Sequence, residues 1–444
     1  MILSRFFLPA RLKTRKALAL SAVLLVLVTA SFIGFITSAS AHETNGPAVN
    51  SSRISGAIVI AWNQELLHIV QTPGAQPATL HPTRSYAIMH AAIYDAIVSI
   101  TRNAPPFLFS VTAARGARPD AAAAEAGHDV LVTLYPAFQA ELDKQLVNEL
   151  AAIPNGASKQ HGIQVGHTIA RIWIAIRADD GSAVTPPPFV PGNQPGNYRP
   201  TPPNFPAPAF TNWSRVQPFV LSRADQFRPA PPPALTSKAY AQALNEVESL
   251  GQDTSTTRTP EQTTIGKFWG APIWNTWNEI ADTVALAHHT NLETTARMFE
   301  ELNLTFADST IAFYDAKYHY QLWRPITAIR LADIDGNPAT IANPNWNALT
   351  VTAPDPSYPG AHSAISEAGA VVLTAFFGRH DSFQLTSDVL PGVTRSFNSF
   401  AAAAEEAGLS RIYAGQHTRL DHVAGVELGS DVAHFVLFHL NDID

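Results

Sequence analysis

Apolar residues recur at helical spacing along most of this 444-residue chain, and alternating strand patterns are scarce. The spacing predicts about four helices between residues 54 and 177, among them 86–100, 121–150 and 162–177. Within the second of the four, His90 and Asp95 lie five residues apart and do not share a face, so we interpret both as structural polar groups.

The helical pattern returns after residue 237. The predicted helices there cover residues 237–250, 260–267, 277–302, 307–324, 362–377, 395–407 and 419–440. Gly378 and Gly408 stand where glycines commonly end helices. The sequence therefore predicts an all-α fold.

A proline-rich segment separates the two helical regions. Residues 185–233 hold 15 of the 34 prolines of the chain, interleaved with aromatic residues. A flexible linker would lack those aromatic side chains, so we expect an ordered, irregular strap packed on the helices. The predicted organisation is an N-terminal helical bundle at 42–184, the strap at 185–236 and a C-terminal helical bundle at 237–444.

The first 41 residues have the composition of a targeting segment. Five basic residues precede an uncharged apolar run from Ala17 to Thr37, and Ala39-Ser40-Ala41 fits a signal-peptide cleavage site. We therefore predict a signal peptide at residues 1–41 and an exported protein. The alternative is an uncleaved membrane anchor, because the apolar run is long enough to cross a bilayer. No other stretch is predicted to span a membrane after cleavage.

Charge and cysteine content exclude several classes of partner and site. Cleavage would leave 24 Lys and Arg against 36 Asp and Glu, a net charge of about −12. This balance argues against nucleic acid as a partner, so any anion must be bound by a local cationic pocket. The chain has no cysteine, which excludes disulfides, thiolate catalysis and Cys-based metal sites.

The stretch 410–421 combines a guanidinium, an imidazole and a carboxylate at close spacing. Thr418 is a predicted helix N-cap, with Asp421 three residues later. His417 would then lie at the mouth of a helix, where backbone N–H groups favour an anion. Asp421 could hold one nitrogen of His417, and Arg411 could reach the same space. The alternative is a capped helix with a surface His and Arg.

Two further stretches carry related chemistry. Lys317 and Arg324 are seven residues apart, so a continuous helix would point both cations the same way. An exposed charged helix face is the alternative there. The loop 356–363 contains Gly360 and Ala361, whose small size allows close approach of backbone N–H groups to a ligand.

His362 follows that loop and would stand at the mouth of the next helix, although a lone His there is usually a cap or a surface group. Taken together, three cations match the charge of a tetrahedral oxyanion such as phosphate or vanadate. The two histidines, His362 and His417, supply a nucleophile or ligand and an acid/base group.

The three stretches resemble the motifs of the vanadium-dependent haloperoxidase and type 2 phosphatidic acid phosphatase superfamily. Lys317, Arg324 and Pro325 match the motif Lys-x6-Arg-Pro in full, and the stretch from Ser410 to Asp421 matches Ser-Arg-x5-His-x3-Asp. The second motif, Pro-Ser-Gly-His, is altered: residues 359–362 read Pro-Gly-Ala-His, so a serine hydroxyl is lost unless Ser357 or Ser363 replaces it.

The resemblance covers most of the mature chain and implies two packed helical bundles, with the oxyanion held mainly by the second. It implies that His417 binds vanadium, or attacks phosphorus in a phosphatase, and that Asp421 orients it. Lys317, Arg324 and Arg411 would hold the oxyanion, Lys317 would also polarise bound peroxide, the Gly360 and Ala361 N–H groups would add donors, and His362 would be the acid/base.

Three functions follow as alternatives from this resemblance. The first is a vanadium-dependent haloperoxidase-like enzyme with vanadate as cofactor and hydrogen peroxide and halide as substrates. The second is an acid phosphatase that hydrolyses phosphate monoesters through a phosphohistidine at His417. The third is a non-catalytic scaffold that binds an anion or a partner. Asp355 stands where family chloroperoxidases carry an aromatic residue and bromoperoxidases a histidine, and an anion there would repel halide.

Overall fold

The computed structural model describes residues 54–186 and 188–441, so the predicted signal peptide at residues 1–41 lies outside the described residues. The regular elements of the first described region are helices. Its helices are α2 (Ala57–Gln71), α3 (Pro82–Thr101), α4 (Pro119–Leu134), α5 (Gln139–Ala151) and α6 (Ala157–Arg177). The single helix predicted at 121–150 is wrong: Pro136 begins a short 3-10 turn, η2 (Pro136–Phe138), that separates α4 from α5.

Small residues let these helices pack closely. A Cβ atom on Gly162 or Gly166 of α6 would lie 2.2 Å and 2.4 Å from backbone oxygens of Arg118 and Ala122, beside and within α4. Helix α3 is buried along almost its whole length. His90 and Asp95 are fully buried there: His90 contacts Asn63, and Asp95 accepts the backbone N–H groups of the loop after α3. Both are structural groups of the helix core.

The proline-rich segment contains no α-helix or strand in its described residues and only one 3-10 turn, η3 (Trp213–Arg215). It nevertheless packs against the helices. The Asp308 carboxylate accepts the backbone N–H groups of Phe219, Val220 and Leu221 at 2.7–2.8 Å, and Trp213 is 1% exposed. These bonds satisfy backbone groups that an irregular segment would otherwise leave unpaired.

The second helical region follows. Its helices are α7 (Lys238–Gly251), α8 (Pro260–Phe268), α9 (Ile273–Ala287), α10 (Leu292–Tyr320), α11 (Pro325–Arg330), α12 (Ala361–Phe377), α13 (Phe400–Tyr413) and α14 (Arg419–Asn441), with a 3-10 turn, η4 (Ala332–Ile334). Gly378 ends α12 with a φ of 87°, as predicted. With two short strands besides, the prediction of an all-α protein is confirmed.

Three local predictions in this region are wrong. The break predicted between residues 302 and 307 lies instead between α9 and α10, because Asn291 caps α10 by accepting the Thr294 N–H at 3.0 Å. Residues 394–397 form β2 (Thr394–Phe397), antiparallel to β1 (Phe383–Thr386), with Phe383 opposite Phe397. Gly408 does not end a helix. It lies inside α13, where a Cβ atom would be 2.4 Å from the His422 ring.

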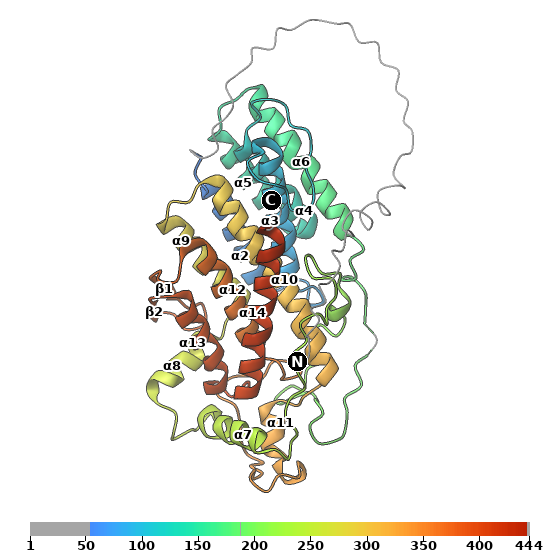
Figure 1. Ribbon diagram of the computed structural model, residues 1–444, viewed down its shortest axis with the longest axis vertical. Helices are drawn as coiled ribbons and strands as arrows, with labels where there is room; N and C mark the ends of the chain where they lie inside the picture. Colours follow the sequence, from blue (N-terminus) through green and yellow to red (C-terminus); the bar gives the residue numbers. More distant parts are fainter. Residues whose placement is uncertain (1–53, 187, 442–444) are drawn as a thin grey trace, which may run out of the picture. The chain divides into compact units, whose positions relative to one another are not determined.

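Helix α10 is shared by the two helical groups. It packs against α3 of the first group and against α12 and α14 of the second (Figure 1). One continuous hydrophobic core runs through both groups. A second, smaller core surrounds the segments that carry the candidate site. It includes Trp323, Tyr358 and Ile412, which are neighbours in sequence of Arg324, Ser357 and Arg411.

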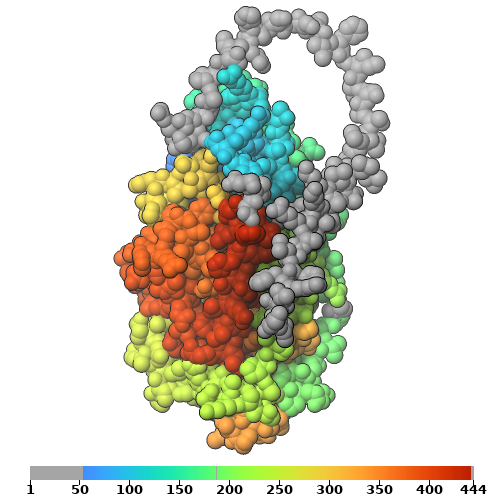
Figure 2. All heavy atoms as spheres, in the orientation of Figure 1, coloured from blue at the N-terminus to red at the C-terminus, as the bar shows by residue number. Residues whose placement is uncertain are grey.

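Helix α14 is long and apolar enough, by length and composition, to cross a membrane. It packs along α12, and Leu428, Val432 and Val436 are buried against the core, while Val423 and Phe438 are exposed. Figure 2 shows the dark red C-terminal segment reaching the surface on the side viewed. A helix with one face on the core and the other exposed is expected at the surface of a helical bundle.

Candidate functional site

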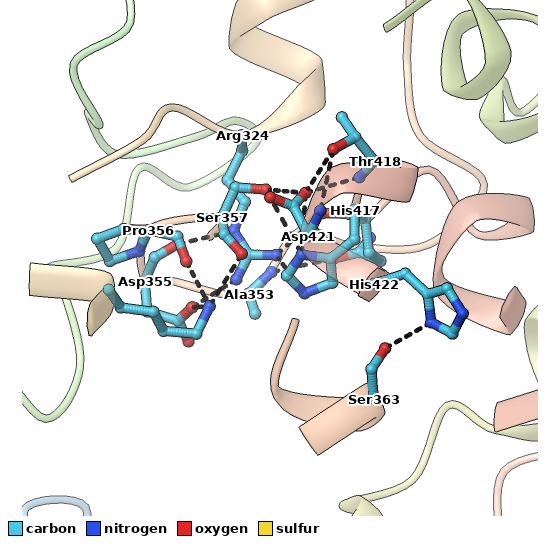
Figure 3. Close-up of polar contacts among 12 residues, drawn as sticks. Arg324, Ala353, Asp355, Pro356, Ser357, Ser363, His417, Thr418, Asp421 and His422 are labelled. Carbon is cyan, nitrogen blue, oxygen red and sulfur yellow. Dashed lines mark hydrogen bonds and ion pairs between the residues drawn. The ribbon is translucent and has the colours of Figure 1, made fainter. Parts of the chain in front are cut away.

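The three motif stretches meet in one buried cluster. Lys317 comes from the last turn of α10, Arg324 from the residue before α11, Arg411 from α13, and His417 from the residues before α14. All four side chains are buried. Figure 3 shows the polar contacts that join Arg324, Asp355, Ser357 and His417. The three stretches therefore meet in space, as the sequence predicted.

Lys317 and Arg324 were predicted to point the same way from one continuous helix, and this prediction is wrong. Helix α10 ends at Tyr320, and Gln321 has a left-handed backbone with a φ of 50°. Arg324 is extended (φ −76°, ψ 154°), as the residue before a proline tends to be. Lys317 and Arg324 therefore do not share a helix face. They converge because the chain turns after α10 and both side chains reach the same carboxylate.

His417 has one nitrogen facing donors and one facing acceptors. Its Nε2 lies 3.2 Å from Arg324 Nη1, which can only donate, so Nε2 carries the lone pair. Its Nδ1 lies 3.4 Å from Asp421 Oδ2 and 3.5 Å from Ser357 Oγ, so Nδ1 carries the proton. Burial, reinforced by the Arg324 charge, lowers the pKa of His417 to about 3. A neutral imidazole with its lone pair on Nε2 suits a nucleophile or a metal ligand, which would take the place of the Arg324 contact.

Asp421 fixes both the helix start and the imidazole. Its Oδ2 accepts the Thr418 N–H at 2.7 Å and the Ser357 hydroxyl at 2.8 Å, in addition to facing His417. Thr418 Oγ1 lies 3.4 Å from the Asp421 nitrogen, which completes a reciprocal cap at the start of α14. Burial opposes ionisation, but the His417 contact and these donors keep the pKa of Asp421 below its ordinary value.

Asp355 lies directly between two of the predicted oxyanion ligands. Its Oδ1 is 2.8 Å from Lys317 Nζ and 2.6 Å from Arg324 Nη2, and its backbone carbonyl accepts Arg324 Nε–H at 2.7 Å. Burial would raise the pKa of Asp355, but the two cations outweigh it and lower the pKa to about 2. Burial lowers the pKa of Lys317 to about 8, with Asp355 opposing this and Arg324 adding to it. Lys317 and Arg324 thus already have an anionic partner.

Arg411 has no anionic partner among the described residues. Its nearest acceptor is the Trp269 carbonyl, 3.5 Å from Nη1, and its Nε is buried without a hydrogen-bond partner. Burial and the Arg324 charge lower the pKa of Arg411 to about 10, so it remains protonated at neutral pH. A buried, unpaired guanidinium is costly and is the kind of group that an anionic ligand would satisfy.

His362 faces the same carbonyl. Its Nε2 is 3.1 Å from the Trp269 oxygen, which can only accept, so the neutral ring carries its proton on Nε2 and its lone pair on Nδ1. Burial, the Arg411 charge and the His417 ring lower the pKa of His362 well below its ordinary value. His362 is therefore a neutral imidazole at neutral pH and can take up a proton at Nδ1.

The altered second motif supplies fewer donors than predicted. The Gly360 N–H donates to the Asp421 carbonyl at 2.8 Å, so its assignment as an oxyanion donor is contradicted by the structure. Ala361 is the first residue of α12, and a helix leaves its first N–H groups without an intrahelical acceptor. Neither serine replaces the lost hydroxyl, because Ser357 donates to Asp421 and Ser363 pairs with His422 Nδ1 at 2.9 Å.

The donor set still fits a tetrahedral oxyanion such as vanadate. Arg411 lacks an anionic partner, the N-terminus of α12 begins beside the site, and His417 offers a nitrogen lone pair. Asp355 is the feature that the resemblance did not imply, since its carboxylate already pairs with Lys317 and Arg324.

One other cluster has the composition of a metal site. Ligand atoms of Glu125, His128 and Asp129 on α4 lie within 4.8 Å of one another. His128 pairs with Asp129 and Asp143, and His167 pairs with Asp129 at 2.6 Å. These contacts make the cluster a network of His–carboxylate ion pairs that joins α4 to α5 and α6.

Three contacts at the site were not predicted from the sequence. They are the Trp269 carbonyl shared by His362 and Arg411, the Ser357 hydroxyl on Asp421, and the Gln416 carbonyl that accepts Arg324 Nη1–H at 3.0 Å. Two are backbone oxygens, which no residue type marks. Only the polar Ser357, next to the altered motif, carried a hint.

Comparisons with known proteins point to one family. A family model described as the VCPO second helical-bundle domain matches residues 297–443. Vanadium chloroperoxidase from Curvularia inaequalis is 24% identical over 493 aligned residues, which cover 83% of this chain and 80% of the relative.

Solved structures extend the likeness along the chain. The first bacterial vanadium-dependent iodoperoxidase superposes with a TM-score of 0.76 at 26% identity, covering 88% of this chain and 97% of that one. A holo-type bacterial vanadium-dependent chloroperoxidase superposes with a TM-score of 0.64 at 16% identity, covering 84% of this chain and 96% of that one. At that identity the second likeness shows the fold alone.

Proposed function

Because the chain belongs to the vanadium-dependent haloperoxidase and type 2 phosphatidic acid phosphatase superfamily, and is an enzyme of that type, we propose that it is an exported haloperoxidase. It would use vanadate to oxidise halide with hydrogen peroxide. The observation that carries the proposal is that one site holds both a buried cation without an anionic partner, Arg411, and a neutral imidazole, His417. Export rests on the sequence of residues 1–41.

Each site residue has a distinct task in this proposal. His417 Nε2 would bind vanadium, and the three cations Lys317, Arg324 and Arg411 would hold the oxygens. Bound vanadate would supply a Lewis acid that activates peroxide for attack by halide. Asp421 keeps the proton of His417 on Nδ1, so Nε2 keeps the lone pair that would bind vanadium in place of the Arg324 contact.

His362 is suited to proton transfer. Since the ring is neutral and its Nδ1 is free of the Trp269 contact, it can accept a proton from hydrogen peroxide as the peroxide binds. Protonated Lys317 would polarise the peroxide oxygen. Arg324 donates to the Gln416 carbonyl and faces His417, which holds the loop before α14 in place.

Asp355 favours a second candidate, a phosphatase acting on phosphate monoesters. Its carboxylate, held ionised by two cations, would repel an approaching halide. In a phosphatase, His417 Nε2 would attack phosphorus, forming an N–P bond as the P–O ester bond breaks. Water would then hydrolyse the phosphohistidine. A non-catalytic scaffold is not supported, since the similar proteins named above are enzymes.

The two activities are separated by assays on the purified chain with and without orthovanadate. A haloperoxidase halogenates a phenol dye with peroxide and bromide or iodide only when vanadate is added. A phosphatase hydrolyses p-nitrophenyl phosphate, and vanadate inhibits it. Absence of both activities, together with no binding of vanadate by calorimetry, would refute the proposal.

A further inference from the structure

Asp355 forms a clamp with the two cations of the first motif. A single oxygen, Oδ1, contacts both Lys317 Nζ at 2.8 Å and Arg324 Nη2 at 2.6 Å. Arg324 also donates Nε–H to the Asp355 carbonyl, so the guanidinium grips both the backbone and the side chain of this residue (Figure 3). All three residues are at least nine-tenths buried. Because Oδ1 lies between the two cations, an oxyanion oxygen that bridged them would need the same place.

We propose that Asp355 is a specificity-determining residue, a built-in counter-anion whose carboxylate competes with the oxyanion for Lys317 and Arg324. This inference rests on the proposed function, since it concerns the ligand of the same site. An oxyanion that uses both cations must displace the carboxylate. Among the described residues, Arg411 and the N-terminus of α12 are available without that exchange.

The charges of the site give the direction of the effect. Lys317, Arg324 and Arg411 contribute three positive charges, and the Asp355 and Asp421 carboxylates remove two. With both histidines neutral, the site has a net charge of about +1, which matches a dianion poorly. Without the Asp355 charge it would be about +2. The carboxylate therefore weakens binding of any tetrahedral dianion and acts as a repulsive element against loosely bound anions.

Two buried donors that lack an acceptor lie within the electrostatic range of Asp355, and they would take the carboxylate if an oxyanion displaced it. His81 Nδ1 accepts the Thr83 N–H at 3.4 Å, so the proton of this neutral ring is on Nε2, which is buried without a partner. The hydroxyl of Tyr198 is likewise buried and unpartnered. The Asp355 charge acts on the pKa of both groups, which places them in its electrostatic range. Unsatisfied buried donors are rare and call for an acceptor.

The test measures oxyanion affinity rather than turnover. Wild type, Asp355→Asn and Asp355→Ser are titrated by calorimetry with orthovanadate and with inorganic phosphate at pH 7. Asn is isosteric with Asp and can still accept from Arg324, so D355N is expected to fold. We expect both neutral variants to bind each oxyanion at least about tenfold more tightly than wild type. Asp315→Asn is the matched control, because Asp315 pairs with Arg228 outside the site. Its affinity should equal that of wild type.

Tyr198→Phe tests the receiving donors. It should weaken oxyanion binding in the wild-type background and have no effect in the D355N background, because there is then no carboxylate to receive. If wild type binds vanadate but the neutral variants bind no tighter, the role of Asp355 is refuted and the proposed function stands. If no variant binds either oxyanion, the proposed function itself fails. If neither neutral variant folds, Asp355 is a structural counter-ion of the two cations, which also contradicts competition.

Discussion

Replacing Arg411 should stabilise the protein while destroying its ligand site. Arg411 is 8% exposed, its guanidinium has no carboxylate partner among the described residues, and its Nε has no acceptor. Burial and the Arg324 charge lower its pKa from the ordinary value of an arginine to about 10. Each pKa unit corresponds to ~1.4 kcal/mol, so keeping Arg411 charged costs the folded state about 3 kcal/mol.

Arg411→Met keeps the length of the side chain and removes the charge. Removal of the buried charge should stabilise the folded state, and loss of the weak contact to the Trp269 carbonyl should offset part of this effect. We therefore expect the free energy of unfolding to rise by about 1–3 kcal/mol in phosphate-free buffer. Denaturant unfolding followed by circular dichroism measures this. Adding phosphate or orthovanadate should stabilise wild type, by ~2.7 kcal/mol at a hundred times the dissociation constant, and should leave R411M unchanged.

Arg395→Met is the matched control. This guanidinium pairs with Glu406 at 2.5 Å and with Glu261 at 2.8 Å, so its loss should destabilise the protein by about 1–3 kcal/mol. The reasoning is refuted if R411M proves as destabilised as R395M without oxyanion, or if phosphate protects R411M as strongly as it protects wild type.

Three further predictions concern the reaction, its pH dependence and the fold. His417→Ala should abolish both halogenation and phosphatase activity, whereas His319→Ala, which removes an exposed imidazole at the end of α10, should retain wild-type turnover. Because burial lowers the pKa of Lys317 to about 8, its side chain carries a positive charge below pH 8 and loses that charge above pH 8. Sulfate, whose own charge is constant, should therefore bind with steady affinity from pH 6 to 7.5 and up to about tenfold more weakly by pH 9; affinity that does not fall would contradict this. Gly429→Ala would place a Cβ atom 2.1 Å from the Ala364 carbonyl oxygen, so separation of α12 from α14 should cost about 3 kcal/mol in denaturant unfolding, and an unchanged midpoint would disprove that close contact.

The sequence predicted the fold class and the meeting of the motif stretches because both depend on residue types at fixed spacings. Apolar periodicity marks helices, and Thr418 with Asp421 marks the start of α14. The predictions failed where a single local contact determines where a helix begins or ends. Asn291 moved a helix boundary by capping α10, and Pro136 split α4 from α5.

At the site, too, the features that could not be predicted from the sequence are individual contacts. Asp355 was identified as an anion near the second motif, but its position on Lys317 and Arg324 depends on how the chain turns after Tyr320. The loss of Gly360 as a donor depends on a backbone bond between two distant segments. Such contacts follow from tertiary packing, which periodicity and motif spacing do not encode.

The continuity of α10 restricts how this protein can be divided. The family match begins at residue 297, one turn inside a helix that starts at Leu292 and delivers Lys317 at its far end. A fragment cut at that boundary would lose the Asn291 cap and the α3 surface on which α10 rests. The second helical group, which carries the candidate site, is therefore not expected to fold without the first. Gene truncations or chimaeras joined at residue 297 should give insoluble protein, and exchanges between relatives should be made in the loop before Asn291.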